Sequence, residues 1–181
     1  MFEESGNNYV KYQGDKLGKL THSRTEAYAL LKPDSIKEGC VPTIIQILTD
    51  NGFHIVEFKE IEVTEGDAEK LYAGDLLRAR DETKKSEVKA GIRNLTGNCI
   101  ILSLYRQPTN NKTAWEELSE IKGNAKTSGI RTIRGKLCLP PPSDLSEDDR
   151  LRWIAKTRVH SPWDFIEINT FGNLLINKGI I

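Results

Sequence analysis

Apolar residues along the chain occur in two patterns that alternate from the amino-terminal third onward. Residues 27–31 and 99–104 are short, mostly apolar runs, and residues 53–63 form a longer extended run. Such runs, bounded by glycine, proline or asparagine, are typical of strands. Residues 41–48 instead carry apolar side chains at helical spacing, and Asn51 and Gly52 then supply a stop signal. The pattern therefore predicts strand, helix, strand in the first part of the chain.

Further helices are predicted from capping residues and apolar spacing. Thr64 with Asp67 three residues later can begin a helix that carries Tyr72, and residues 113–121 repeat a helical period. Residues 81–95 look helical but are mostly charged, which indicates a peripheral helix. Ser146 opens a helix to about residue 157, after a stiff spacer of three prolines at 140–142. Residues 165–181 receive no assignment.

Alternating strands and helices favour a single sheet covered by helices. We therefore expect an α/β (α+β) fold, a ferredoxin-like sandwich in which helices cover an antiparallel sheet. Residues 1–24 are polar and contain glycines without sustained periodicity, which predicts a flexible N-terminal extension. Residues 25–181 are then expected to form one domain.

Composition narrows the possible partners and the compartment. Lys plus Arg and Asp plus Glu number 26 each, so the net charge is zero. No global field attracts nucleic acid or an anionic membrane, and any anion site must be local. The three cysteines are odd in number and lack paired spacing, which favours a reducing compartment. No apolar run approaches the ~20 residues that span a bilayer, so we expect a cytoplasmic protein with no membrane partner.

Two cations lie where strand-like segments are expected to meet turns. Lys32 follows the first strand, and Arg134 lies in a basic loop with Lys122, Lys126 and Arg131. A rigid scaffold can direct such side chains at a ligand, and phosphate accepts both the planar fork of Arg and the point charge of Lys. The alternative is that these cations only solvate the surface.

His160 is the histidine with the most promising setting. It lies just beyond a predicted helix, whereas His22 and His54 lie in the polar tail and in a strand. A neutral imidazole is nucleophilic near physiological pH and can carry a phosphoryl group; the alternative is a structural histidine. The chain shows no metal-ligand motif and no GxxxxGK[ST] phosphate loop.

Four segments together resemble the nucleoside diphosphate kinase family. They are TEAYALLKPD at 25–34, AEKLY at 68–72, TIRG at 132–135 and RVHS at 158–161. These segments occur in the family's order across roughly residues 25–168. The resemblance implies that His160 is the phosphate carrier and that Lys32, Tyr72 and Arg134 bind the nucleotide phosphates.

The resemblance also implies an activity. An NTP would give its γ-phosphoryl group to His160, and an NDP would then take it, with Mg²⁺ bound mainly through the nucleotide phosphates and no dedicated metal site. It further implies a homo-oligomer, and NTP and NDP as partners without specific nucleic acid.

Some family positions differ in this chain. Residues 76–93 lack the Arg-Pro-Phe-Phe segment whose phenylalanine stacks on the base. The family's Gly-x-Thr reads Gly123-Asn124-Ala125, so a threonine that normally reaches phosphate is missing. Thr157 stands in place of an asparagine, Lys136 replaces an aspartate, and residues 140–156 form an insertion. Lys122, Lys126, Thr127 or Arg131 could replace the missing phosphate contacts.

The alternative function is therefore that of a catalytically impaired family member that binds nucleotide or a protein. A weaker third hypothesis assigns the basic loop to nucleic acid, which the zero net charge disfavours.

Overall fold

Four strands form one antiparallel sheet in the order β2-β3-β1-β4. The computed structural model describes residues 23–109, 111–123, 129, 131–162 and 165–181, without the side chains of residues 165 and 166. The strands are β1 (Glu26–Leu31), β2 (His54–Val63), β3 (Gly97–Tyr105) and β4 (Val159–His160). The ferredoxin-like α/β fold with an antiparallel sheet is therefore confirmed.

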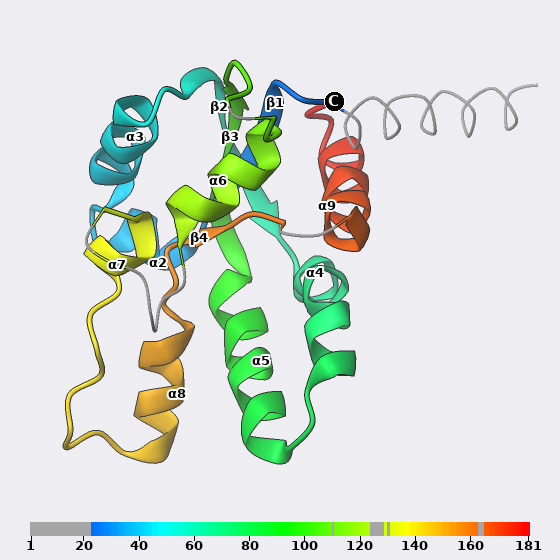
Figure 1. Cartoon of the computed structure of the whole chain (residues 1–181). Coiled ribbons are helices and arrows are strands. Elements are labelled where there is room, and N and C mark those ends of the chain that lie inside the picture. Colours follow the sequence, from blue (N-terminus) through cyan, green and yellow to red (C-terminus); the bar gives the residue numbers. More distant parts are fainter. Residues whose placement is uncertain (1–22, 110, 124–128, 130, 163–164) are drawn as a thin grey trace, which may run out of the picture.

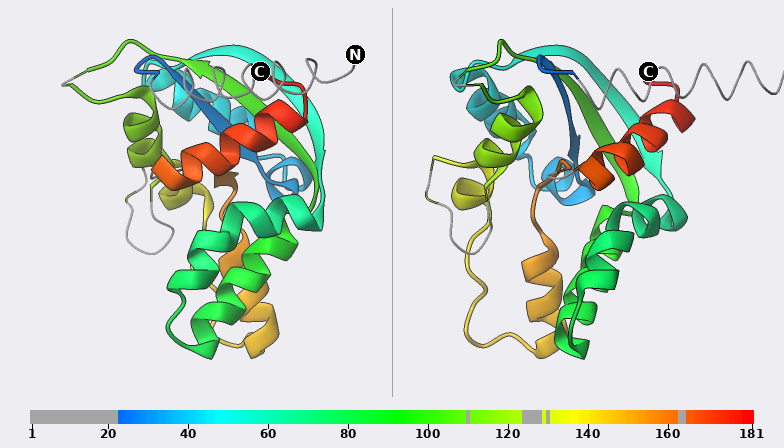
Figure 2. Two further views of the ribbon diagram at one scale, coloured as in Figure 1. Left: turned by 90° about the vertical axis from the view of Figure 1, so that its right-hand side faces the viewer. Right: turned by 45° about the vertical axis from the view of Figure 1, so that its right-hand side comes forward.

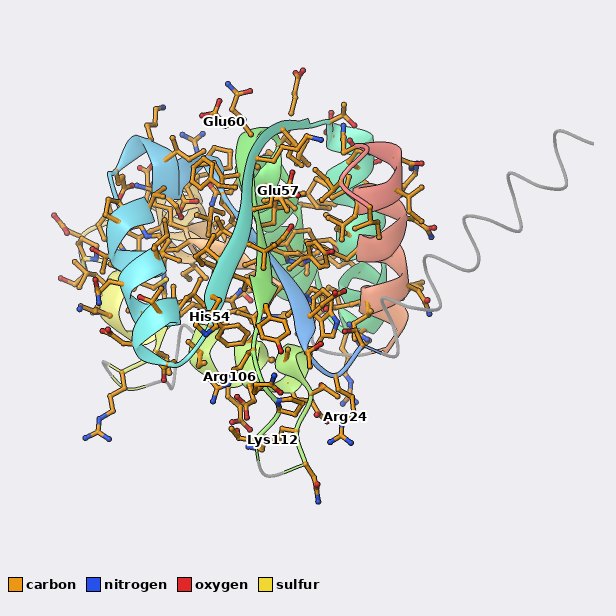
Figure 3. All side chains as sticks on the ribbon, turned by 90° about the horizontal axis from the view of Figure 1, so that it is seen from above. Arg24, His54, Glu57, Glu60, Arg106 and Lys112 are labelled. Carbon is orange, nitrogen blue, oxygen red and sulfur yellow. The ribbon has the colours of Figure 1, made fainter. Side chains whose placement is uncertain are left out.

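Helices cover both sides of this sheet, with α3 on one side and α4 and α9 on the other (Figures 1 and 3). The helices are α2 (Pro33–Lys37), α3 (Val41–Asp50), α4 (Glu65–Arg78), α5 (Glu82–Leu95), α6 (Ala114–Lys122), α7 (Ile133–Leu137), α8 (Glu147–Ala155) and α9 (Phe165–Asn177). None of them combines the length and the apolar character that a bilayer span requires, among the residues described.

The two apolar runs that predicted strands form the centre of the sheet. β1 pairs with β3 along its whole length, from Glu26 opposite Tyr105 to Leu31 opposite Ile100. Residues 27–31 and 99–104 are buried, because helices cover both faces of these strands. β2 lies at the edge of the sheet and is more exposed. His54 begins β2 at the end of the sheet where Arg106 also lies (Figure 3).

The α4–α5 hairpin projects from the sheet, and α8 packs beside α5 (Figure 2). The expected helix at 81–95 is present as α5, but the expectation that it is peripheral is wrong for one of its faces. Val88, Ile92 and Leu95 belong to the hydrophobic core. Their spacing of four and three residues places them on one side of the helix, where they pack, while the charged side chains take the other side.

Several short elements differ from the sequence-based expectations. Arg134 lies inside the five-residue helix α7 and not at the end of a strand, because the Thr132 hydroxyl accepts a bond from the Gly135 amide and caps a helical turn. The unassigned carboxyl-terminal segment contains α9. Residues 1–22 of the expected extension lie outside the described residues.

Candidate functional site

Lys32 lies at the corner where β1 ends and α2 begins. Pro33 occupies the first turn of α2, and Lys32 keeps an extended backbone with φ −75° and ψ 160°, as the residue before a proline prefers. Its side chain is completely buried. Nζ donates a hydrogen bond of 3.0 Å to the Tyr72 hydroxyl. The ammonium is thus directed into the molecule, toward α4.

Tyr72 is carried by α4, whose first turn is fixed by a capping box between Thr64 and Asp67. Its ring centroid lies 5.4 Å from that of His160. A Cβ atom added to Gly91 of α5 would lie 3.3 Å from Tyr72 Cζ. Glycine at this position therefore allows α5 to approach the ring closely.

His160 ends the short strand β4 and is paired with Leu30 of β1. Its ring lies between two aromatic rings, with centroids 5.4 Å from Tyr72 and 6.0 Å from Phe171 of α9. Only 6% of the residue is exposed. β1, α4 and α9 therefore hold the imidazole from three directions.

Arg158 anchors the chain just before His160 to α2. Its guanidinium forms ion pairs with Asp34 at 3.3 Å and Glu38 at 2.8 Å. Its carbonyl oxygen accepts hydrogen bonds from the Lys32 amide at 3.0 Å and the Ser35 hydroxyl at 2.6 Å. Arg158 also has a positive φ of 65°, which turns the chain into β4. The positions of Lys32 and His160 are thus coupled through one residue.

The environment of His160 favours its neutral form. Burial lowers the pKa of His160 well below its ordinary value, and the neighbouring cations Lys122, Lys32 and Arg134 lower it further. A neutral imidazole retains a lone pair on one ring nitrogen. His160 can therefore act as a nucleophile or a hydrogen-bond acceptor at neutral pH.

Arg134 ties α7 to two backbone segments around the site. Its guanidinium donates to the carbonyl oxygens of Val159 at 2.9 Å, Thr157 at 3.4 Å and Gly123 at 3.4 Å. The bond to Val159 fixes the residue immediately before His160. Thr157 contributes a carbonyl to this network.

Lys122 is the last residue of α6 and is 6% exposed. Nζ donates a hydrogen bond of 2.6 Å to the carbonyl oxygen of Ser161. Burial, followed by the charge of Arg134, lowers the pKa of Lys122 to about 7. The sequence placed this residue in a basic loop; the structure places it inside the site.

The cations of the site have no acidic partners of their own. In the part of the chain that the structure describes, none of Lys32, Lys122 and Arg134 forms an ion pair with a carboxylate. The nearby carboxylates of Asp75 and Glu167 both pair with Arg78, at 3.1 and 3.4 Å. Two buried cations, Lys32 and Lys122, and the half-buried Arg134 therefore create a local positive field without counter-ions, which favours an anionic ligand.

Two cavities adjoin this cluster. One of about 280 Å³ is lined by Lys32, Tyr72 and Arg134, and its far wall is formed by residues of α5 and α8. A second of about 730 Å³ lies between α5, residues 135–141 and α8, and Glu87 and Ile154 line both cavities. The insertion expected at 140–156 therefore forms much of the wall of the larger cavity.

The structure brings the four sequence-predicted residues into one cluster. Lys32, Tyr72 and Arg134 line the smaller cavity, while His160 contacts Tyr72 and is not part of the lining. Arg131, one of the proposed substitutes, is exposed, and Lys126 and Thr127 lie outside the described residues. Phe171 had no signal in the sequence beyond the apolar character of its segment.

Comparison with known families gives a match over residues 25–140 to the family described as nucleoside diphosphate kinase. The matched range contains Lys32, Tyr72 and Arg134, and it ends before α8 and His160. No curated protein matches the sequence.

Solved structures show the same fold at low sequence identity. A nucleoside-diphosphate kinase from Borrelia burgdorferi, a transition state mimic with bound vanadate and ADP, has a TM-score of 0.60 and 18% identity, covering 84% of this chain and 88% of its own. The Aquifex aeolicus nucleoside diphosphate kinase has a TM-score of 0.56 and 16% identity, covering 83% and 93%. An NDP kinase from Pyrobaculum aerophilum has a TM-score of 0.55 and 18% identity, and the match covers 80% of this chain and 91% of that one.

Proposed function

Because the chain belongs to the nucleoside diphosphate kinase family, we propose that it transfers the γ-phosphoryl group of an NTP to an NDP through a phosphohistidine at His160. The observation that carries the proposal is a neutral, buried imidazole beside three cations that lack carboxylate partners. The cations supply charge for a polyphosphate, and the imidazole supplies the nucleophile.

The proposed reaction consists of one transfer and its reverse. The lone pair of the His160 ring forms a P–N bond to the γ-phosphorus as the β–γ P–O bond breaks, and the electron pair of that bond leaves on the NDP. The proton on the other ring nitrogen stays on the ring. An incoming NDP then attacks phosphorus, the P–N bond breaks, and its electrons return to the imidazole. Phosphoryl transfer needs mainly positioning and charge stabilisation from the protein.

Lys32 and Arg134 would hold phosphate oxygens at the smaller cavity, and Tyr72 would orient them from α4. The nucleoside would extend toward the larger cavity, because the two cavities share Glu87 and Ile154 as walls.

Mg²⁺, when bound to the nucleotide, would neutralise charge on the phosphates. Asp75 and Glu87 are the carboxylates that face the smaller cavity, and they suit an ion that takes one or two protein carboxylates and otherwise binds water and phosphate. Among the described residues, no group of three or more His, Cys, Asp or Glu could hold a metal.

The second candidate function is nucleotide binding without turnover. It is favoured by one observation: His160 does not line the smaller cavity, whereas Tyr72, whose ring centroid is 5.4 Å from that of His160, does. Transfer would require the γ-phosphate to leave this cavity and reach the imidazole. The missing family positions, including the base-stacking phenylalanine of residues 76–93, point the same way.

Labelling with γ-³²P-ATP separates the two functions. We expect the wild-type protein to acquire an acid-labile, base-stable label that ADP removes as labelled ATP. His160→Asn should abolish the label, whereas His54→Asn, which changes an exposed histidine on β2, should retain it. A wild-type protein that binds ATP without labelling, or a His160→Asn protein that labels equally, would overturn the kinase mechanism in favour of binding alone.

We also propose a homo-oligomer and a cytoplasmic location. β2 is an edge strand on which Val56 is 70% and Phe58 is 47% exposed, and exposed apolar edge strands favour association. Cys40, Cys99 and Cys138 are all free, which suits a reducing compartment.

A further inference from the structure

Lys122 is directed into the site by the geometry of α6. The helix begins at Thr113 with a capping box to Glu116, buries Trp115 and Leu118 in the core, and ends at Gly123. Its final side chain therefore continues inward, along the face that packs against β1.

The hydrogen bonding of this lysine leaves most of its capacity unused. An ammonium has three donors, and within the described residues Nζ has one protein partner, the Ser161 carbonyl at 2.6 Å. The groups whose charges act on it are Arg134 of α7, Lys32 after β1, Asp75 of α4 and Glu167 of α9. A buried ammonium beside two like charges is unfavourable unless an anion joins it.

Ser161 gives a second, independent indication of a missing ligand. It is 1% exposed, and its hydroxyl has no hydrogen-bond partner in the described part of the structure. Buried hydroxyl groups are rarely left without a partner. Ser161 follows His160 directly in the chain, and its carbonyl accepts the bond from Lys122, so an unused hydroxyl and an underused ammonium meet at the residue after the candidate nucleophile.

We propose that Lys122 is a catalytic residue whose ammonium, together with the Ser161 hydroxyl, binds oxygens of the γ-phosphoryl group during transfer to and from His160. This inference rests on the proposed function and names the residue that performs the role of the phosphate contacts missing after Gly123. Lys122 donates to the phosphoryl oxygens and does not itself exchange a proton with substrate.

A purely structural Lys122 would give different results. If it only held residues 159–162 in place through the Ser161 carbonyl, its replacement would lower the stability of the fold. It would also lower the affinity for all nucleotides by the same factor. A lysine that binds the γ-phosphoryl group instead distinguishes ATP from ADP. It also makes the reaction depend on its protonation.

The first test compares the affinities of ATP and ADP, and it needs no turnover. The variants are Lys122→Met, Lys122→Arg and Lys136→Met, the last being an exposed lysine on α7; circular dichroism checks that each is folded. We expect Lys122→Met to lose about 10-fold in affinity for ATP with little change for ADP, and Lys122→Arg and Lys136→Met to stay close to wild type. Equal losses for ATP and ADP in Lys122→Met would overturn the inference.

The second test is the pH dependence of labelling. At subsaturating ATP the rate reports the free protein, so it should fall above pH about 7 as Lys122 loses its proton. Burial keeps the titration of His160 well to the acid side. Lys122→Arg stays charged, so its labelling rate should not fall there, and Lys136→Met should follow wild type.

If the labelling rate of Lys122→Arg falls above pH about 7 as in wild type, the inference is overturned and the kinase function still stands. Selective loss of ATP affinity without wild-type labelling would overturn the kinase function and the catalytic role of Lys122, and would leave it as a residue that only binds the γ-phosphate.

Discussion

At the scale of single residues, the burial of Lys122 has a cost that depends on pH. The unfolded chain keeps this lysine protonated up to its ordinary pKa of 10.5, whereas the folded protein releases the proton near pH 7. Between these values the unfolded state binds more protons than the folded state. The free energy of unfolding therefore rises with pH across this window, as far as Lys122 determines it.

Lys122→Met should consequently stabilise the free protein at low pH. We expect the free energy of unfolding to increase by about 2 kcal/mol at pH 6, because removing a buried charge outweighs the loss of one hydrogen bond. The gain should shrink as the pH approaches 10, where wild-type Lys122 is neutral. Urea unfolding at pH 6, 8 and 10 measures this, and a variant less stable than wild type at pH 6 would contradict it.

The sequence could identify most of these residues but not their burial. Lys32, Tyr72 and Arg134 stand out through segments that resemble one family, and the structure gathers them around one cavity. Lys122 was one of several basic residues near a loop. Charged side chains are rarely buried, so no sequence pattern marks the one that turns inward.

At the scale of elements, β4 depends on Arg158. Asp34 is 6% exposed, and burial raises the pKa of its carboxyl, while Lys32 and Arg158 oppose that rise. Without Arg158 the buried carboxylate would lose a cation and its pKa would rise further. Between the unfolded and folded pKa values, the folded state would bind more protons, so stability would fall as pH rises.

Arg158→Met is therefore expected to lower the free energy of unfolding by about 3 kcal/mol at pH 7. The loss should be smaller near pH 4, because the pKa of Asp34 is raised and more of its carboxyl is neutral there than at pH 7. Chemical unfolding at both pH values checks this, with Arg152→Met on the exposed face of α8 as the matched control. A loss that is the same at both pH values would show that the ion pair with Asp34 is not its cause.

The elements predicted correctly are those long enough to show a period. β1, β2 and β3 follow apolar runs, and α3, α4, α6 and α8 follow apolar spacing or caps. The five-residue helices α2 and α7 and the two-residue strand β4 are shorter than two helical turns or one clear alternation. α2 and α7 depend on the local signals of Pro33 and Thr132, whereas β4 depends on pairing with β1, a contact between segments far apart in the sequence.

At the scale of the whole molecule, the edge strand β2 should determine the oligomeric state. Phe58→Lys places a charge on this strand, and charged edge residues oppose pairing between strands. We expect light scattering after size exclusion to give a multiple of the 20.4 kDa chain for wild type and the monomer mass for Phe58→Lys. Leu77→Lys, the same kind of change at an 89% exposed position on α4, should leave the mass unchanged. A monomeric wild type would remove the oligomer proposal.

The enclosure of His160 by Tyr72 and Phe171 bears on the lifetime of a phosphorylated form of the protein. A phosphoramidate is lost when water reaches phosphorus, and these rings, with only 6% of the residue exposed, keep bulk water away. A phosphorylated form would therefore outlive the departure of the first nucleotide. The phosphoryl group would then stay on His160 until an acceptor NDP binds, so the donor and acceptor nucleotides need not be bound at the same time.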